Sequence, residues 1–249
     1  MSGHSKWSTI KRQKGAADAK RGALFTKLAR EIQVAARAGG GDPDMNATLR
    51  LAVSKARDNN MPADNIERAI KKGTGDLEGA ELQEMRYEGY GPGGAAILID
   101  TLTDNKNRTV SEVRNIFTRA GGNMAEAGAV AWVFEPRGVI TLEVDGAGAD
   151  DLALFAIDAG AQDVELEDGG VDVITEPQSF EAVRKALEEA GYSVISGEVT
   201  MSPKTTVSLD EETAVKALRL LEQLEDHDDV QRVYSNADFP DSVLAAYAG

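Results

Sequence analysis

The first 37 residues concentrate side chains that bind phosphate. They hold nine lysines and arginines against two acidic residues, a local net charge of +7. Lysine and arginine release condensed counterions when they contact a nucleic-acid backbone, so such binding weakens steeply as salt rises. Trp7 stands among these cations, where its indole would either stack on an unpaired base or anchor the segment to a folded domain. We therefore predict a nucleic-acid-binding surface that consists of Lys6, Trp7, Lys11, Arg12, Lys14, Lys20, Arg21, Lys27 and Arg30.

The charge of the chain divides between its two ends. The formal net charge is −15, but residues 1–75 carry 15 basic and 7 acidic side chains, a net of +8, and residues 76–249 carry 12 and 35, a net of −23. An acidic body repels nucleic acid and leaves the basic module as the docking surface. The acidic clusters 165–168 and 226–229 are expected to be solvated, with a basic protein partner as the alternative.

Residue types that support catalysis or metal binding are scarce. Cysteine is absent, and His4 and His227 lie in neither a zinc-binding nor a triad pattern. We interpret His227, which stands in an acidic turn, as a solvated loop residue. The stretch 89–94 has G-x-G-x-x-G spacing, but it precedes a strand and contains Pro92, so we predict a tight turn. We expect no catalytic residue, no metal and no cofactor; a metal-assisted enzyme that uses the acidic residues is the alternative.

Three helices are expected to carry the basic side chains of the N-terminal region. Apolar residues recur at helical spacing over residues 16–38, with lysines and arginines on another arc. The glycines 39–41 end that helix, and Asp42-Pro43 is predicted to begin a second helix that reaches residue 58. A third short helix is predicted over 63–72. None of them buries its apolar face alone, so we predict a small bundle.

Beyond residue 85 the apolar spacing alternates between that of strands and that of helices. The strands are predicted at 95–102, 127–135, 139–144, 163–166, 171–175, 192–200, 205–209 and 230–235, and the helices at 109–120, 150–159, 180–190 and 210–224. This order contains β-α-β-β-α-β twice, with the second copy nested in the first.

The predicted fold is therefore α+β and multidomain, with an N-terminal three-helix domain followed by two ferredoxin-like α/β sandwich domains, one inserted in the other. The domains would be 1–75, 76–135 together with 205–249, and 136–204. A linear arrangement of the two sandwich domains is the alternative.

The sequence also bears on location. No apolar run approaches the roughly 18 residues of a membrane span. The basic N-terminus is not followed by the apolar stretch of a secretory signal. The absence of cysteine fits a reducing compartment. We expect a cytoplasmic protein without membrane contact.

Several long segments resemble the YebC/PmpR family. The two longest are GHSKWSTIKRQKGAADAKRGALFTKLAREI and AARAGGGDPDMNATLRLAVSKARDNNMPADNIERAIKKG, and the shorter ones are YEGYGPGG, DTLTDNKNRT, VRNIFTRAGGN and GAVAWVF. The resemblance covers essentially the whole chain. It implies a helical N-terminal domain, two α/β domains and no catalytic residues.

The same resemblance implies a cytoplasmic, probable transcriptional regulatory protein that binds DNA. Related proteins include the mitochondrial translational activator of cytochrome oxidase subunit I, and bacterial members are also placed on the ribosome as translation factors. The expected partner is thus DNA, with ribosomal RNA or the ribosome as the alternative. No helix-turn-helix, zinc finger or RNP signature indicates which bases would be read.

Overall fold

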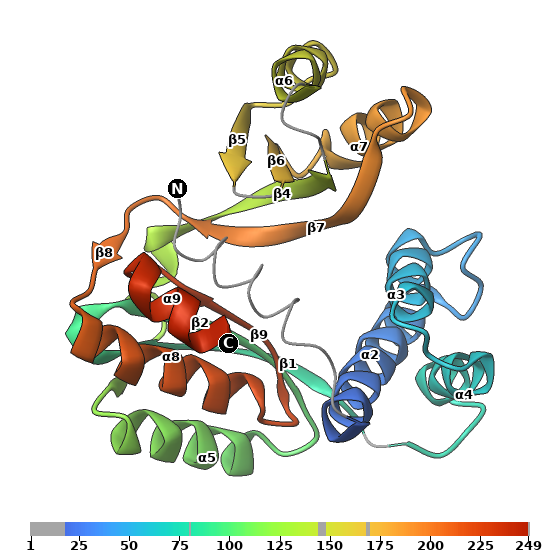
Figure 1. Ribbon diagram of the computed structural model, residues 1–249. Coiled ribbons are helices and arrows are strands. Elements are labelled where there is room, and N and C mark those ends of the chain that lie inside the picture. Colours follow the sequence, from blue (N-terminus) through green and yellow to red (C-terminus); the bar gives the residue numbers. More distant parts are fainter. Residues whose placement is uncertain (1–17, 80, 144–147, 168–169, 249) are drawn as a thin grey trace.

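The computed structural model describes residues 18–79, 81–143, 148–167 and 170–248 (Figure 1). Three helices stand together at the N-terminal end, and two antiparallel four-stranded sheets with their helices make up the rest. In this described part of the chain, no helix is long and apolar enough to cross a membrane.

The three N-terminal helices form the predicted bundle around one apolar core. Leu28, Ile32 and Leu49 are fully buried at its centre. Two of the helices approach closely because Gly73 lacks a side chain: a Cβ there would stand 2.4 Å from the carbonyl oxygen of Gln33. The helices are α2 (Asp18–Gly39), α3 (Ala47–Asp58) and α4 (Ala63–Thr74).

Helix α3 begins later than predicted. Asn46 is its N-cap, and its side-chain oxygen accepts a hydrogen bond from the backbone N–H of Leu49 at 3.1 Å. The amide of the same buried side chain donates to the carbonyl of Ala35 at 2.8 Å and so fixes the end of α2. The predicted start at Asp42-Pro43 is wrong, because Asp42 caps a turn instead and accepts from the N–H of Asp44 at 2.9 Å. An asparagine serves both helix ends, which an aspartate without donors cannot do.

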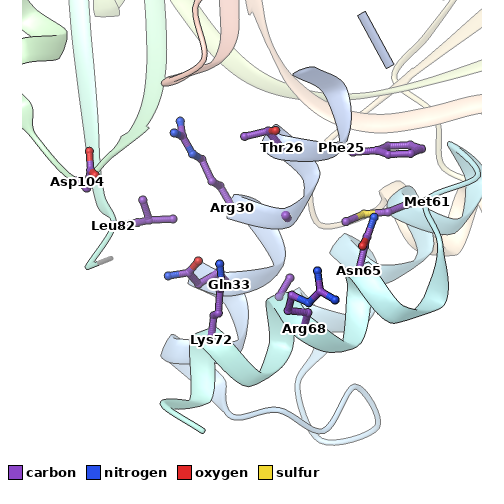
Figure 2. Close-up of a pocket in the computed structure, with 12 residues that line it drawn as sticks. Phe25, Thr26, Arg30, Gln33, Met61, Asn65, Arg68, Lys72, Leu82 and Asp104 are labelled. Carbon is purple, nitrogen blue, oxygen red and sulfur yellow. The ribbon is translucent and has the colours of Figure 1, made fainter. Parts of the chain in front are cut away.

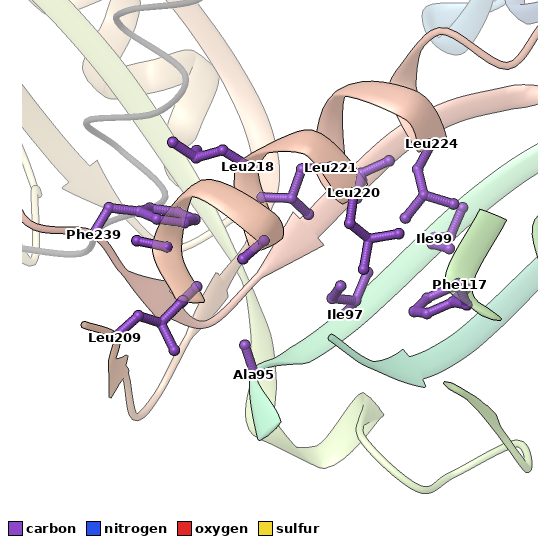
Figure 3. Close-up of a cluster of buried hydrophobic side chains, with 14 of the residues drawn as sticks. Ala95, Ile97, Ile99, Phe117, Leu209, Leu218, Leu220, Leu221, Leu224 and Phe239 are labelled. Carbon is purple, nitrogen blue, oxygen red and sulfur yellow. The ribbon is translucent and has the colours of Figure 1, made fainter. Parts of the chain in front are cut away.

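The first sheet has the strand order β3-β1-β2-β9, and two long helices cover one of its faces. Figure 3 shows Ile97 and Ile99 of the central strand packed against Phe117 of one helix and Leu221 and Leu224 of the other. A short C-terminal helix that the sequence did not reveal joins the same core. The elements are β1 (Gln83–Tyr90), β2 (Ala96–Thr103), α5 (Lys106–Arg119), β3 (Asn123–Ala125), α8 (Glu211–Glu225), β9 (Val230–Ser235) and α9 (Asp241–Ala248).

Of the predicted strand 127–135, only the last two residues are in a strand, as the start of β4 (Phe134–Glu143), and residues 127–133 cover the other face of the first sheet instead. This segment forms a turn and a short 3-10 helix, η2 (Ala131–Val133), and its apolar side chains pack on Leu98. The buried carboxylate of Glu88 holds it there by accepting from three backbone N–H groups, those of Gly128, Val130 and Ala131, at 2.6 to 2.8 Å. The prediction failed because an apolar run that packs on a sheet looks in sequence like a strand within one.

Other strands also differ from the predictions: β1 and the short β3 were missed, and the strand predicted at 205–209 is shorter than expected. Strand β1 was not expected, because its sequence QEMRYEGY is mostly polar. The predicted strand 205–209 shrinks to β8 (Val207–Ser208), which pairs with β10 (Ala237–Asp238) outside the first sheet. The glycine-rich stretch after β1 is the predicted turn: the N–H of Gly91 donates to the carbonyl of Ala95 at 2.8 Å, and the chain reverses into β2.

The second sheet lies in sequence between β3 and β9 and has the order β5-β6-β4-β7. All of its pairings are antiparallel, and its helices share one core with Ile140, Leu142 and Val173. This is the strand order of a ferredoxin-like β-α-β-β-α-β unit. Its elements are β4 (Phe134–Glu143), α6 (Ala149–Asp158), β5 (Asp163–Glu167), β6 (Gly170–Thr175), α7 (Phe180–Glu189) and β7 (Ser193–Pro203).

Strand β4 runs through Pro136, where the sequence indicated a break. At that position β4 pairs only with β7, since its pairing with β6 starts at Gly138. A proline lacks a backbone N–H and is tolerated where one side of the strand has no ladder to complete.

The predicted fold class is confirmed. Read from its other edge, the first sheet has the order β9-β2-β1-β3, so β1 occupies the place of the third ferredoxin-like strand although it comes first in the chain. The second sheet is formed by a segment inserted between β3 and β9 (Figure 1). We keep the division into domains at 1–75, 76–135 with 205–249, and 136–204 as a proposal.

Candidate nucleic-acid interface

Three of the nine predicted nucleic-acid-binding residues have described side chains: Arg21, Lys27 and Arg30, all on α2. Arg21 is exposed, and the other two are partly buried. The remaining predictions lie outside the described residues; these are Lys6, Trp7, Lys11, Arg12 and Lys14, and the side chain of Lys20.

Lys27 and Arg30 contact the acidic turn 225–229, which joins α8 to β9. The ammonium group of Lys27 donates to the carbonyl oxygen of Glu225, at the end of α8 where the helix dipole is negative. The guanidinium of Arg30 donates to the carbonyl oxygen of Asp228 at 2.5 Å and to the carboxylate of Asp229 at 2.9 Å. These contacts attach the helical bundle to the first sheet.

Asp229 is the centre of this attachment, and its side chain is only 3% exposed. Its carboxylate also accepts hydrogen bonds from Arg108 at 2.9 Å, from Thr109 at 2.7 Å and from Thr103 at 3.2 Å. Burial alone would raise the pKa of Asp229, but the hydrogen bonds from Arg108 and Thr109 and the charges of Arg30 and Arg108 lower it to about 2. The carboxylate is therefore ionised at neutral pH, with a positive charge on either side.

The turn 225–229 is thus structural, and the predicted solvation of His227 and Asp229 is wrong. The His227 side chain is 13% exposed, and its Nε2 lies 2.8 Å from a carboxylate oxygen of Glu112 on α5. Its Nδ1 accepts from the backbone N–H of Asp229 at 3.1 Å, which assigns the ring proton to Nε2. The turn folds back over α5 because these partners lie there, and a charge count along the sequence does not reveal them.

Glu112, His227 and Asp229 also form a cluster whose potential metal-ligating atoms lie within 4.8 Å of one another. Both ring nitrogens of the histidine already have protein partners. The aspartate faces two guanidinium groups, which would repel a cation. The chemistry of this cluster is that of a structural ion-pair network.

A groove of about 360 Å³ runs between α2 and α4, and we call it the α2–α4 groove (Figure 2). In Figure 2 the side chains of α4 form one wall and those of α2 the other. Leu82, just before β1, and Asp104, just after β2, lie beyond Arg30. It is lined by Phe25, Thr26, Ala29, Arg30, Gln33, Met61, Asn65, Arg68, Ala69, Lys72, Leu82 and Asp104.

Arg68 and Lys72 are the cations of this groove that have no partner among the residues the structure describes. Both are exposed, and neither forms an ion pair or side-chain hydrogen bond with any residue that the structure describes. The neighbouring Lys71, by contrast, pairs with Glu67 at 2.5 Å. Arg68 and Lys72 were not among the residues predicted to bind nucleic acid, although polar residues at positions 65, 68 and 72 recur at the spacing of one helix face.

A second hollow, of about 690 Å³, adjoins the first and shares Gln33 and Lys72 with it. Glu78, Glu81 and Arg37 also line it, and Arg37 pairs with Glu81 at 2.6 Å. An anion would meet the carboxylate of Glu78 and a cation that is already paired, so the α2–α4 groove is the better site for a phosphate.

Comparison with known proteins covers the whole architecture. Residues 5–76 match the family model of the TACO1/YebC protein N-terminal domain, and residues 82–237 match that of the TACO1/YebC second and third domain. A probable transcriptional regulatory protein of Dehalococcoides mccartyi is 58% identical over 247 residues, which cover 99% of this chain and 98% of that protein. Another, from Desulfosudis oleivorans, is 58% identical over 98% of this chain and 99% of its own length.

A solved structure agrees with these matches. The crystal structure of a conserved hypothetical protein from Aquifex aeolicus superimposes with a TM-score of 0.81 at 45% sequence identity, over 90% of this chain and 93% of that one. The resemblance inferred from the sequence motifs is confirmed, and the chain belongs to the TACO1/YebC family.

Proposed function

We propose that this protein is a non-catalytic, cytoplasmic regulator of gene expression that binds DNA through its basic N-terminal domain. The observation that carries the proposal is the division of charge, +8 in residues 1–75 against −23 in the remainder. The names of the relatives, probable transcriptional regulatory proteins, agree with it. The binding residues would be Lys6, Trp7, Lys11, Arg12, Lys14, Lys20, Arg21, Lys27 and Arg30, together with Arg68 and Lys72.

In this proposal Lys27 and Arg30 both bind nucleic acid and hold the helical bundle on the first sheet, because they already donate hydrogen bonds to the acidic turn 225–229. A phosphate that competes for these cations would have to displace carbonyl groups and a carboxylate of the same chain. The N-terminal cations and the pair on α4 would therefore make the first contact with the nucleic acid.

The alternative is a translation factor that binds ribosomal RNA through the same domain. Phosphate contacts do not distinguish the two targets, since they position a protein on a backbone without reading bases. Which of the two targets is correct must be decided by measuring which nucleic acid the full-length protein binds.

The test compares duplex DNA with purified ribosomes as ligands of the full-length protein at physiological salt. A variant with Lys11→Ala, Arg12→Ala and Lys14→Ala should weaken binding to the true target and flatten its salt dependence. The matched control removes three positive charges from the acidic part instead, by Lys185→Ala, Lys216→Ala and Arg219→Ala. Retention by ribosomes alone would exclude the DNA form, and failure to bind either target even at low salt would exclude both.

A basic protein partner for the acidic α/β domains is a second candidate role. From Gly138 to Val183 the chain has 12 acidic residues and no lysine or arginine. Leu154 and Ile157 on α6 and Leu166 on β5 are exposed by 47 to 69% within this region. Apolar side chains in an acidic surround complement a basic amphipathic segment.

This second role is tested with a synthetic peptide of lysine and leucine residues. The full-length protein should bind the peptide, and Leu154→Ser should weaken binding although it leaves every charge in place. Reversal of Asp150, Asp151 and Asp158 to lysine should abolish it. If Leu154→Ser has no effect, the attraction is one of net charge only and the docking role is wrong.

A further inference from the structure

The α2–α4 groove combines two kinds of surface that a single-stranded nucleic acid needs. One is the exposed pair Arg68 and Lys72, which stand four residues apart on α4 and so lie on the same face of the helix. The other is an apolar stretch that includes the half-buried ring of Phe25 and the buried side chain of Met61. Figure 2 shows Phe25 and Met61 together at one end of the groove.

The positive charge of the groove is available to a ligand because the nearby acidic residues are engaged elsewhere. Glu67 pairs with Lys71, and Glu31 pairs with Lys55 at 2.9 Å. Asp104, on the far rim, pairs with Arg108 at 2.9 Å. A phosphodiester would therefore find two cations in the groove that no carboxylate among the described residues neutralises.

Asn65 supplies a polar group between the two surfaces. It belongs to the same face of α4 as Arg68 and Lys72, and it lies seven residues, about 10 Å, before Lys72 along the helix. A carboxamide presents a donor and an acceptor together and can pair with the edge of a base. The groove thus has a basic end for the backbone and an apolar end with an amide for a base.

We propose that the α2–α4 groove binds single-stranded nucleic acid, with phosphates on Arg68 and Lys72 and one unstacked base against Phe25. The inference rests on the proposed nucleic-acid-binding function and narrows it to a ligand class. A base can enter a concave site only when it has left its stack. Unpaired bases are the normal targets of protein recognition in RNA loops and ends, whereas duplex DNA keeps its bases inside. The groove has a volume of about 360 Å³, near the lower end of the range for small-molecule sites.

The experiment measures fluorescence anisotropy of a labelled, unstructured RNA decamer with the full-length protein. Single-stranded DNA of the same sequence, the corresponding RNA duplex and DNA duplex, and a glutamate-rich peptide are the other ligands. The variants are R68A/K72A and F25L, and the control is R57A, which removes an exposed arginine on α3 outside the groove. Circular dichroism and thermal melting establish that each variant is folded.

The single-stranded RNA should bind more tightly than either duplex. R68A/K72A should reduce the slope of log affinity against log salt by about 1.4, since each phosphate contact on a single strand contributes about 0.7. F25L should weaken single-strand binding at least fivefold, because base–aromatic stacking contributes roughly 1–3 kcal/mol per base. R57A should change neither quantity. Single-stranded DNA bound within twofold of RNA would also support the groove, because base and phosphate are common to both.

Three outcomes would overturn the inference. One is equal binding of duplexes and single strands with no response to R68A/K72A or F25L, which leaves the proposed nucleic-acid-binding function intact. Another is that the glutamate-rich peptide binds more tightly than any nucleic acid and that R68A/K72A and F25L abolish this binding, which would make the groove a site for an acidic protein segment. The third is no binding of any nucleic acid by the folded wild-type protein, which would also remove the proposed function. If F25L does not fold, R68A/K72A on the surface of α4 still decides the matter.

Discussion

The guanidinium of Arg30 lies 2.9 Å from the buried carboxylate of Asp229, which follows it in the chain by 199 residues. Arg108 binds the other oxygen of the same carboxylate, also at 2.9 Å. A buried charge that loses its partner is strongly destabilising, more so than the intact pair is stabilising. The contact between α2 and the first sheet therefore depends on all three groups being present.

Asp229→Asn should lower the free energy of unfolding by roughly 3 kcal/mol, because it leaves two arginines facing a neutral amide. Urea denaturation at neutral pH measures the change. Asp228→Asn is the control, since the side chain of Asp228 is exposed and only its carbonyl oxygen binds Arg30. That control should stay within about 0.5 kcal/mol of the wild type. Equal behaviour of the two variants would contradict the structural role of Asp229.

Because of the Asp229 carboxylate, the free energy of unfolding should depend on pH within a narrow acidic range. The pKa of Asp229 is about 2 in the folded chain against an ordinary 3.8, so its contribution is complete above about pH 5 and is lost as pH falls through 3.8 toward 2. At 1.36 kcal/mol per pKa unit the loss amounts to roughly 2 kcal/mol. The difference in unfolding free energy between wild type and Asp229→Asn, followed against pH, should be constant from pH 7 to about pH 5 and then shrink. Shrinkage already between pH 7 and pH 5 would assign the effect to another group.

A double-mutant cycle measures the energetic coupling between Arg30 and Asp229 in unfolding. Arg30→Ala and Asp229→Asn, alone and combined, should give a coupling energy of about 1–3 kcal/mol, as expected for residues within one ion-pair network. A second cycle with Lys27→Ala and Asp229→Asn is the control, because Lys27 contacts the carbonyl of Glu225. Its coupling should be smaller than that of the first cycle. Equal coupling in both cycles would mean that the two domains separate as a whole when either contact is removed.

Glu88→Gln tests how the loop 126–134 is held on the first sheet. Burial would raise the pKa of Glu88, but hydrogen bonds from the backbone N–H groups of Gly128, Val130 and Ala131 lower it. A glutamine has one acceptor oxygen and would turn its NH₂ group toward an N–H donor. We expect a loss of about 1.5–3 kcal/mol in unfolding free energy, the range for hydrogen bonds to a charged group. Glu84→Gln, at an exposed position of the same strand, should change little.

Two glycine substitutions should act in opposite directions. Gly73→Ala places a Cβ 2.4 Å from the backbone oxygen of Gln33 and should destabilise the bundle by about 1–3 kcal/mol. Gly22→Ala meets no atom of the described residues within 4 Å and should stabilise α2 by up to about 1 kcal/mol through helix propensity. Thermal unfolding of the two variants gives the signs. Stabilisation by both would mean that α4 moves away from α2 without cost.

Much of the fold follows from local signals in the sequence. The helix predicted at 210–224 matches α8 to within one residue at each end, and Asp210 caps it by accepting from the N–H of Thr213 at 2.9 Å. The strand predicted at 230–235 matches β9 at both ends. The strands predicted at 163–166 and 171–175 match β5 and β6 to within one residue at each end. These elements are visible because capping and alternation are properties of neighbouring residues.

The features that escaped prediction depend on partners far along the chain. Strand β1 is polar by composition and becomes a strand because β2 and β3 flank it. In the sequence Asp229 is one of several acidic residues in a turn, and its burial depends on Arg30 and Arg108, which are distant in the chain. Arg68 is one cation among fifteen in the basic domain, and only the packing of α4 on α2 places it in a groove. The nucleic-acid-binding residues before α2 stay a prediction.

The position of the inserted segment has a consequence for synthesis on the ribosome. Ile97, Ile99 and Phe117 complete their core with residues of α8 such as Leu218, about one hundred positions later. At roughly 5–20 residues per second, the nascent chain would carry this apolar surface uncovered for about 5–20 s. During that interval the second sheet can already close, since its strands are contiguous in the chain. Chaperones should therefore bind the incomplete first sheet during synthesis and be released once β9 has emerged from the ribosome.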